Sequence, residues 1–326
     1  MLGRRAGVGK ALSRSMAVEA CAKDTKGQTC YICTQALHWK TKEGLVRGCA
    51  CRGTAGFAHV SCLAEQAQIL VAEAEENNLD NKALQARCDR WDICGLCEQR
   101  YHGVVECALG WACWKTYVGR AETDLVRVMA MNVLGLNLSN TGHYEDALPV
   151  QEAELSMMRR LGKPVLAMLD VQLNIAITYA RLGRLESARD LLRDVYSGNL
   201  EILGEDDSNT IIAAANYASS LKDLHSYEEV KSLLRKVMPA ARRAFGETHE
   251  LMLKMRLGYA MALYRDPSAT LGDLREAVTT LEDTERTARR VLGGAHPVTV
   301  DVECELRKAR AARGDAIAGE FLSSDT

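Results

Sequence analysis

The stretch Cys49-Ala-Cys51-Arg-Gly-Thr-Ala-Gly-Phe-Ala-His59-Val-Ser-Cys62 decides the fold of the first third of the chain. It contains two short pairs of metal-binding side chains, with seven residues between the pairs. Two further cysteine pairs, each separated by two residues, flank this stretch: Cys30 with Cys33, and Cys94 with Cys97. Two ligands so close in sequence sit on one tight turn and reach one tetrahedral ion, and a structural zinc site takes four ligands. The four pairs therefore predict two zinc ions.

The order of these eight side chains, with cysteine fourth and histidine fifth, resembles the RING-CH (RINGv) variant of the RING family. Ligands in that family are interleaved in a cross-brace, so that the first, second, fifth and sixth bind one ion and the others bind the second. The resemblance implies one site of Cys30, Cys33, His59 and Cys62 and another of Cys49, Cys51, Cys94 and Cys97. Each ion then joins segments that are distant in sequence, so we expect the zinc finger, residues 25–104, not to fold without metal.

The resemblance also implies a function for this region. RING domains perform no covalent chemistry; they bind a ubiquitin-conjugating enzyme and hold its thioester-linked ubiquitin in a reactive pose. The docking surface lies between the two zinc loops, and the matching residues here are Tyr31, Ile32, Gly95 and Leu96. Family members usually carry a tryptophan a few residues after the sixth ligand, which this chain lacks, and Trp91 is our candidate for that aromatic. This departure keeps an inactive zinc-binding adaptor open as an alternative.

The PHD finger, which binds histone tails, shares the order of cysteines and histidine and is the main competing family. PHD fingers usually place two or more residues between the third and fourth ligands and four or five before the histidine. This chain has one and seven, and both spacings favour RING-CH. Trp91, three residues before Cys94, resembles a PHD aromatic and keeps a histone-tail reader open as an alternative.

The composition restricts the class of protein. The 326 residues carry a net charge of -2, which gives no electrostatic reason to expect a nucleic-acid partner. Only 5% of the residues are aromatic while Ala and Leu are abundant, which favours helices. No window approaches 18 consecutive apolar residues, so no membrane span is expected. We therefore expect a soluble, mainly α protein of about two domains.

Cysteine usage indicates the compartment. Eleven of the twelve cysteines lie between Cys21 and Cys113, and basic residues interrupt positions 1–20, so no secretory signal peptide is expected. Metal binding in a reducing compartment fits better than a disulfide scaffold, which favours the cytoplasm. The basic stretch also resembles a transit peptide, so an organelle or the nucleus stays open. We expect residues 1–24 to be a disordered tail. The cysteines outside the eight in this region are expected to be small buried residues: Cys21, Cys88, Cys107 and Cys113.

From about residue 115 the sequence becomes repetitive. Leu-Gly or Phe-Gly pairs end at Gly162, Gly204, Gly246 and Gly293, at intervals of 42, 42 and 47 residues. Five extra residues in the last interval coincide with Asp266-Pro-Ser-Ala-Thr270, which we expect to be a loop between two helices. The pattern resembles tetratricopeptide repeats of the kinesin-light-chain type, most clearly at 203–210 and 292–299. The resemblance implies an α-solenoid of four helix pairs and a closing helix over residues 119–315, with a linker helix at 105–118 and a disordered tail at 316–326.

Such arrays present a concave surface lined by the first helix of each pair. Asn174 and Asn216 occupy the same repeat position, Asn132 lies one residue out of register, and Gly258 breaks the series. In the resembled family an asparagine here hydrogen-bonds the backbone of an extended peptide. An asparagine that satisfies a neighbouring turn within the stack is the alternative.

Together the two halves predict a ubiquitin-protein ligase. The zinc region binds the conjugating enzyme, and the repeats recruit a protein or peptide substrate or an adaptor. A non-enzymatic scaffold, in which the zinc region is a structural cap or a histone reader, is the alternative.

Overall fold

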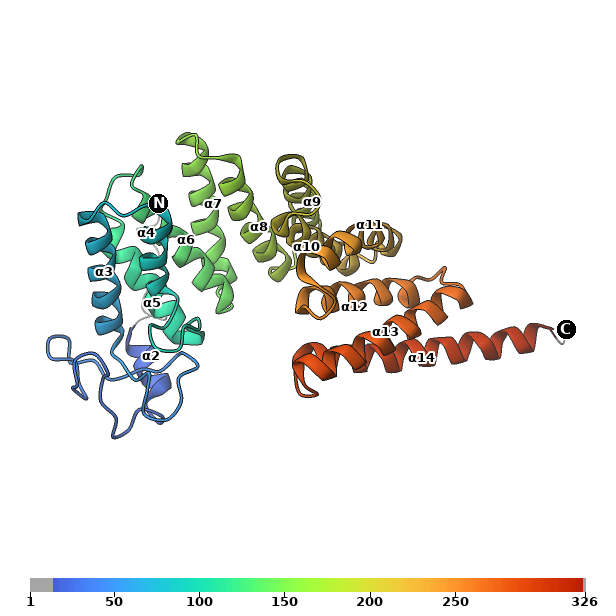
Figure 1. Ribbon diagram of the computed structural model, residues 1–326, viewed down its shortest axis with the longest axis horizontal. Coiled ribbons are helices and arrows are strands. Elements are labelled where there is room, and N and C mark those ends of the chain that lie inside the picture. Colours follow the sequence, from blue (N-terminus) through green and yellow to red (C-terminus); the bar gives the residue numbers. More distant parts are fainter. Residues whose placement is uncertain (1–13, 325–326) are drawn as a thin grey trace. The chain divides into compact units, whose positions relative to one another are not determined.

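Helices make up nearly all the regular structure of the computed structural model, which describes residues 14–324 (Figure 1). The contacts divide the chain into two compact units, residues 1–163 and 164–326. Within the described residues the only β structure is two isolated bridges, Val46 with Ala58 and Ile93 with Arg100. The predicted fold class is confirmed: a small region with cysteine and histidine clusters precedes an array of helical hairpins.

The first unit contains irregular zinc-region loops and two groups of helices. Its elements are α2 (Arg14–Cys21), α3 (Val60–Glu76), α4 (Asn81–Cys88), a 3-10 helix (Asp89–Trp91), α5 (Gly103–Tyr117), α6 (Leu125–Asn140) and α7 (Tyr144–Arg160). Helix α3 follows directly from the decisive stretch, because His59 is its N-cap residue. Its small and apolar residues at 60, 63, 64, 67, 71 and 74 recur at helical spacing and are buried. The helical run expected after Cys62 is thus amphipathic, with one face in the core.

Helix α5 lies at the centre of the first unit. Val105 and Leu109 pack with the zinc-region loops, Cys113 and Tyr117 pack with α3 and Trp91, and Cys107 packs with α6 and α7. A Cβ atom added to Gly48, beside Cys49, would lie 2.5 Å from Cβ of Val105. The predicted linker helix at 105–118 is therefore a core helix, because apolar residues on several of its faces are buried at once.

The predicted disordered tail at 1–24 is also different where the structure describes it. Helix α2 covers the zinc-region loops: Ala17 is fully buried, and the Cys21 thiol donates a hydrogen bond to the carbonyl of Arg47 at 3.8 Å. Gly44 leaves room for Val18, because a Cβ atom there would lie 2.7 Å from Cγ1 of Val18. Residues 1–13 lie outside the described part of the chain.

The second unit is a row of helical hairpins, in which each helix packs against the next along the chain. Its helices are α8 (Val165–Arg181), α9 (Leu185–Leu203), α10 (Ser208–Asp223), α11 (Tyr227–Phe245), α12 (Glu250–Arg265), α13 (Leu271–Leu292) and α14 (Pro297–Ser324). Gly204, Gly246 and Gly293 end three of them at φ of 85°, 81° and 87°, and each N–H bonds to the carbonyl four residues earlier. The predicted punctuation is therefore a set of equivalent helix ends.

The closing helix is longer than expected. Helix α14 packs against α12 and α13 with Val302, Leu306 and Ala309, and its backbone is helical to Ser324, into the segment that was predicted to be a disordered tail from residue 316. None of the helices in the described residues is long and apolar enough to cross a membrane.

The predicted loop at Asp266–Thr270 is present and is fastened by a buried ion pair. The Lys231 ammonium lies 2.9 Å from the Asp266 carboxylate, and their side chains are 6% and 8% exposed. The same carboxylate accepts the hydroxyl and the backbone N–H of Ser268 at 2.6 and 2.9 Å. These bonds from Ser268, together with Lys231, hold the pKa of Asp266 well below its ordinary value.

We expect Asp266→Ala to lower the free energy of unfolding by about 3 kcal/mol, because it leaves the Lys231 charge without its buried partner. The matched change Glu282→Ala breaks an exposed pair with Arg310, 40% and 52% exposed, and should cost less than about 1 kcal/mol. Urea unfolding followed by circular dichroism compares the two. The folded pKa lies below the unfolded one, so this contribution is present at neutral pH and is lost as the pH falls below about 4. Equal losses from the two variants would contradict this assignment.

Candidate metal centre

The two Cys-x2-Cys pairs form two copies of one turn. In the first, the N–H of Ile32 points to Sγ of Cys30 at 3.4 Å, and in the second the N–H of Leu96 points to Sγ of Cys94 at 3.4 Å. Each turn is closed by paired backbone bonds, between Cys30 and Gln35 or Thr34 and between Cys94 and Gln99 or Glu98. Thr34 and Glu98 both adopt positive φ, 60° and 55°. Both pairs are therefore built as zinc knuckles, with each first thiol accepting a backbone N–H.

The eight side chains gather into two groups of four. One contains Cys30, Cys33, His59 and Cys62, and the other contains Cys49, Cys51, Cys94 and Cys97. Within each group one ligand atom from every residue lies within 4.8 Å of the others. The pairing is the interleaved one that the family resemblance implied. Backbone bonds between Val46 and Ala58, at 2.7 and 3.1 Å, join the segments before and after the Cys49–Cys51 turn and so set Cys49 and His59 in place.

The distances within these groups suit zinc. Two sulfur atoms bound at about 2.3 Å to one tetrahedral ion lie about 3.8 Å apart, and sulfur and nitrogen lie about 3.6 Å apart. Sγ of Cys51 and Sγ of Cys94 are 3.8 Å apart. Nδ1 of His59 lies 3.4 Å from Sγ of Cys33 and 3.5 Å from Sγ of Cys62. The donor atoms can therefore hold two zinc ions, with His59 offering Nδ1.

Protonation and the surroundings of the ligands fit the same role. Burial lowers the pKa of His59, which keeps its imidazole neutral as a ligand must be, and Nε2 lies 3.4 Å from the carbonyl of Ala36. Burial raises the pKa of Cys49 to about 11. At Cys97 burial is outweighed by a hydrogen bond from the backbone of Gln99, and the pKa is lowered to about 7. Binding of zinc to the protonated thiols displaces their protons.

The remaining cysteines of this region lie in hydrophobic clusters and outside both groups of four. Cys88 and Cys113 pack with Trp91, Cys107 packs with α6 and α7, and Cys21 packs beneath the zinc-region loops. Burial raises the pKa of Cys88 to about 12, so its thiol stays protonated near neutral pH. These positions agree with the interpretation of the four as small buried residues.

The residues predicted to dock a conjugating enzyme lie in different environments. Ile32 and Leu96 occupy the same position of the two knuckles, with Ile32 partly buried and Leu96 51% exposed. Tyr31 is partly buried, and its hydroxyl donates to Oε1 of Gln66 at 3.4 Å. Trp91 is only 1% exposed, with its ring edge-on to Tyr117 at 5.9 Å. A side chain so deeply packed cannot contact a partner, so Trp91 does not belong to a docking surface.

An exposed aromatic side chain that the sequence reasoning did not select lies beside the first knuckle. Trp39 is 65% exposed and Leu37 is 58% exposed, in the loop that follows Cys33. His38 between them is buried, with its ring 5.4 Å from that of His59 and 6.1 Å from that of Trp39. The run Leu37-His38-Trp39 in an otherwise polar loop was the available signal.

The three asparagines of the repeats also differ. Asn132 hydrogen-bonds the buried Glu154 of α7; burial raises the pKa of Glu154 to about 8 and this bond opposes the rise. Asn216 donates to the carbonyl of Ile212 in its own helix at 2.9 Å, yet it lines a pocket of about 370 Å³ together with Gly258 and the lysines at 222 and 254. Asn174 is partly buried on α8. Asn132 therefore fits the alternative of an asparagine used within the stack.

Comparison with known families assigns both halves of the chain. Residues 30–89 match the model of the RING-variant domain, and residues 168–209 match a model of the tetratricopeptide repeat. The first match ends before Cys94 and Cys97, which the structure nevertheless places with Cys49 and Cys51. The chain thus combines a RING-variant region, whose two clusters are consistent with two zinc ions, with tetratricopeptide repeats. Tetratricopeptide repeats are a protein-interaction fold.

Solved structures similar to the chain are repeat proteins. The structure of the Podosopora anserina putative kinesin light chain nearly identical TPR-like repeats matches with 17% identity and a TM-score of 0.47, over 72% of this chain and 98% of that chain. BtubC (BKLC) from P. vanneervenii matches with 14% identity and a TM-score of 0.49, over 79% of this chain and 87% of that chain. No curated protein sequence matches the chain at a significant level.

Proposed function

We propose that this chain is a RING-CH-type ubiquitin-protein ligase, in which the zinc region binds a ubiquitin-conjugating enzyme and the repeats bind the substrate or an adaptor. The observation that carries the proposal is the pair of four-residue clusters within and just after a RING-variant match, with Ile32 and Leu96 at equivalent positions of twin knuckles. We assign Cys30, Cys33, His59 and Cys62 to one zinc ion and Cys49, Cys51, Cys94 and Cys97 to the other.

The proposed role is to position the partner. Zinc, when bound, supplies rigid links between segments distant in sequence. Ile32, Leu96 and Tyr31 then present an apolar surface to the conjugating enzyme, and the exposed ring of Trp39 takes the role that we had assigned to Trp91. A correctly held thioester reacts faster because the encounter of the reacting groups is no longer left to chance.

The proposed substrate site lies on the first helices of the repeats. The pocket beside Asn216 is lined by residues of α10, α11 and α12, and Gly258 occupies the repeat position that Asn174 and Asn216 hold in other pairs. Because Gly258 has no side chain, space is left beside Leu234, whose Cδ1 lies 3.7 Å from a Cβ atom built at Gly258. An extended peptide could place an apolar side chain there and hydrogen-bond Asn216.

We expect the full chain to assemble ubiquitin chains with activating enzyme, ATP and at least one member of a panel of conjugating enzymes. Ile32→Ala and Trp39→Ala should each reduce the rate at least tenfold, because each removes an apolar contact of the docking surface. Val300→Ala, on α14 and 50% exposed, is the matched control and should keep the full rate. Gel-based transfer assays give the rates, and metal analysis confirms two zinc ions in every variant.

The outcomes separate the ligase from the scaffold. Transfer that disappears in Ile32→Ala with zinc retained supports the ligase. A chain with two zinc ions and no transfer across the whole panel would establish a non-enzymatic adaptor instead.

A further inference from the structure

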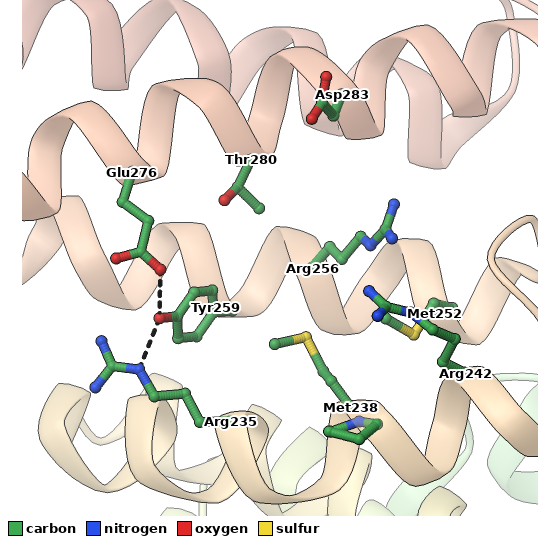
Figure 2. A pocket seen from close by; sticks show the side chains of 10 residues that line it. Arg235, Met238, Arg242, Met252, Arg256, Tyr259, Glu276, Thr280 and Asp283 are labelled. Atoms are coloured by element: carbon green, nitrogen blue, oxygen red, sulfur yellow. Dashed lines mark hydrogen bonds between the residues drawn. The ribbon is translucent and has the colours of Figure 1, made fainter.

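A second pocket of about 370 Å³ lies on the repeats, between α11, α12 and α13 (Figure 2). It shares no lining residue with the pocket beside Asn216. Three arginines line it, Arg235 and Arg242 from α11 and Arg256 from α12. Met238 and Met252 lie between the arginines in Figure 2 and give the pocket an apolar portion.

Two of these arginines share a single carboxylate. Arg242 and Arg256 both form ion pairs with Glu247, in the turn between α11 and α12. Arg256 is only 18% exposed, and burial together with the nearby charge of Arg242 lowers its pKa. Two cations thus converge on one anion, and the site keeps an excess of positive charge at this end of the pocket.

The equivalent positions of the other repeats show that the stack does not need this pair. Arg242 lies four residues before Gly246, and the matching residues are Leu200 before Gly204 and Arg289 before Gly293. Arg256 lies seven residues after the N-cap residue of α12, where α10 has Ala214 and α14 has Glu303. Arg289 and Glu303 bond directly at 2.5 Å. Of these three junctions, one is apolar, one has opposite charges, and only that of α11 and α12 sets like charges together.

The chemistry of the pocket selects its ligand. A phosphate monoester carries close to two negative charges and several acceptor oxygens, so it satisfies two guanidinium groups where one carboxylate satisfies them in part. Glu247 is 44% exposed on a turn, and an incoming dianion can displace it to solvent. The opposite wall is acidic: Glu276 accepts from the Tyr259 hydroxyl at 2.7 Å, and Asp283 pairs with Arg286 at 3.4 Å. These carboxylates would repel a second phosphate and favour a basic residue next to the first.

We propose that this pocket binds a phosphorylated serine or threonine of a partner protein, with Arg242 and Arg256 on the phosphoryl oxygens in the place of Glu247. The Glu276–Tyr259–Arg235 chain of hydrogen bonds, at 2.7 and 2.8 Å, fixes the far end of the pocket (Figure 2). The site is independent of ubiquitin transfer and would give the repeats a partner whose binding depends on a kinase.

Fluorescence anisotropy with the full chain tests the proposal. The probes are phosphoserine peptides with degenerate flanking residues, their unphosphorylated and glutamate-containing counterparts, and inorganic phosphate as a competitor. Arg242→Leu/Arg256→Ala places the residues of the preceding junction in the pocket, so the repeats should stay folded while phosphopeptide affinity falls at least tenfold. Glu247→Gln removes the competing anion and should tighten binding several-fold. Arg243→Leu/Arg310→Ala removes two charges that are 56% and 52% exposed outside the pocket and is the control.

Several results would overturn the proposal. These are equal binding of the unphosphorylated peptides, no phosphopeptide binding by either the unaltered chain or Glu247→Gln, or unchanged affinity in Arg242→Leu/Arg256→Ala with its melting temperature retained. Inorganic phosphate as tight as the peptides would reduce the pocket to a small-anion site.

Discussion

Cys94→Ser is expected to lower the zinc content of the purified chain from two ions to at most one, whereas Cys88→Ser should keep both. The two cysteines are six residues apart, and the RING-variant match covers Cys88 and stops before Cys94. Geometry decides between them, because Sγ of Cys94 lies 3.8 Å from Sγ of Cys51 while Cys88 packs with Trp91. A structural zinc site contributes folding free energy directly, so the loss of one thiolate is severe.

Metal analysis after dialysis and near-ultraviolet circular dichroism measure this pair of variants. Cys94→Ser should also lose the fixed environment of the buried tyrosines 31 and 101, which lie near the second cluster. A Cys88→Ser chain that lost zinc, or a Cys94→Ser chain that kept two ions, would show that the eight ligands are misassigned.

Gly56→Ala is expected to empty the second cluster without touching a ligand. Gly56 has φ of 81°, and an added Cβ atom would lie 2.5 Å from Cβ of Cys51, 3.0 Å from its Sγ and 3.1 Å from Sγ of Cys49. The clash falls on two ligands whose position the ion requires. Gly53 is the matched control, since its φ is also positive, 62°, but nothing lies within 4 Å of an added Cβ atom. Gly53→Ala should cost only the backbone strain, about 1 to 2 kcal/mol.

Zinc competition with a chromogenic chelator compares the two glycine variants. We expect one ion to bind at least tenfold more weakly in Gly56→Ala and both ions to stay tight in Gly53→Ala. Similar zinc affinities in both variants would mean that the loop yields and that the close approach of Gly56 to the cysteines is not needed.

The sequence predicted the zinc clusters well because the ligand pattern is local: each pair sits on one turn, and only the interleaving needs a family rule. The surroundings could not be predicted in this way. Trp91 is buried because α3, α5 and α6 meet around it, and Trp39 is exposed because His38 beside it turns into the core. Sequence spacing near Cys94 carries no information about either outcome.

The repeats show the same division. Helix pairs and their glycine ends follow from a period in the sequence, so the pairs from α6 to α13 were predicted. Helix α5 was misjudged because its apolar residues surround the whole helix, which identifies burial but not the partners that cover it. Asn132 was grouped with Asn174 and Asn216 by position alone, and only its neighbour Glu154 distinguishes it.

The place of α5 joins metal supply to the integrity of the array. Stacked repeats need a cover over their terminal apolar surface. Here Cys107 and Trp111 of α5 cover α6 and α7, while Val105 and Leu109 rest on loops that the zinc ions hold. Oxidation of the thiolates or zinc deprivation would loosen those loops and uncover the first hairpin, a surface that chaperones and proteases recognise. The abundance of the protein in a cell would then follow its zinc and redox state.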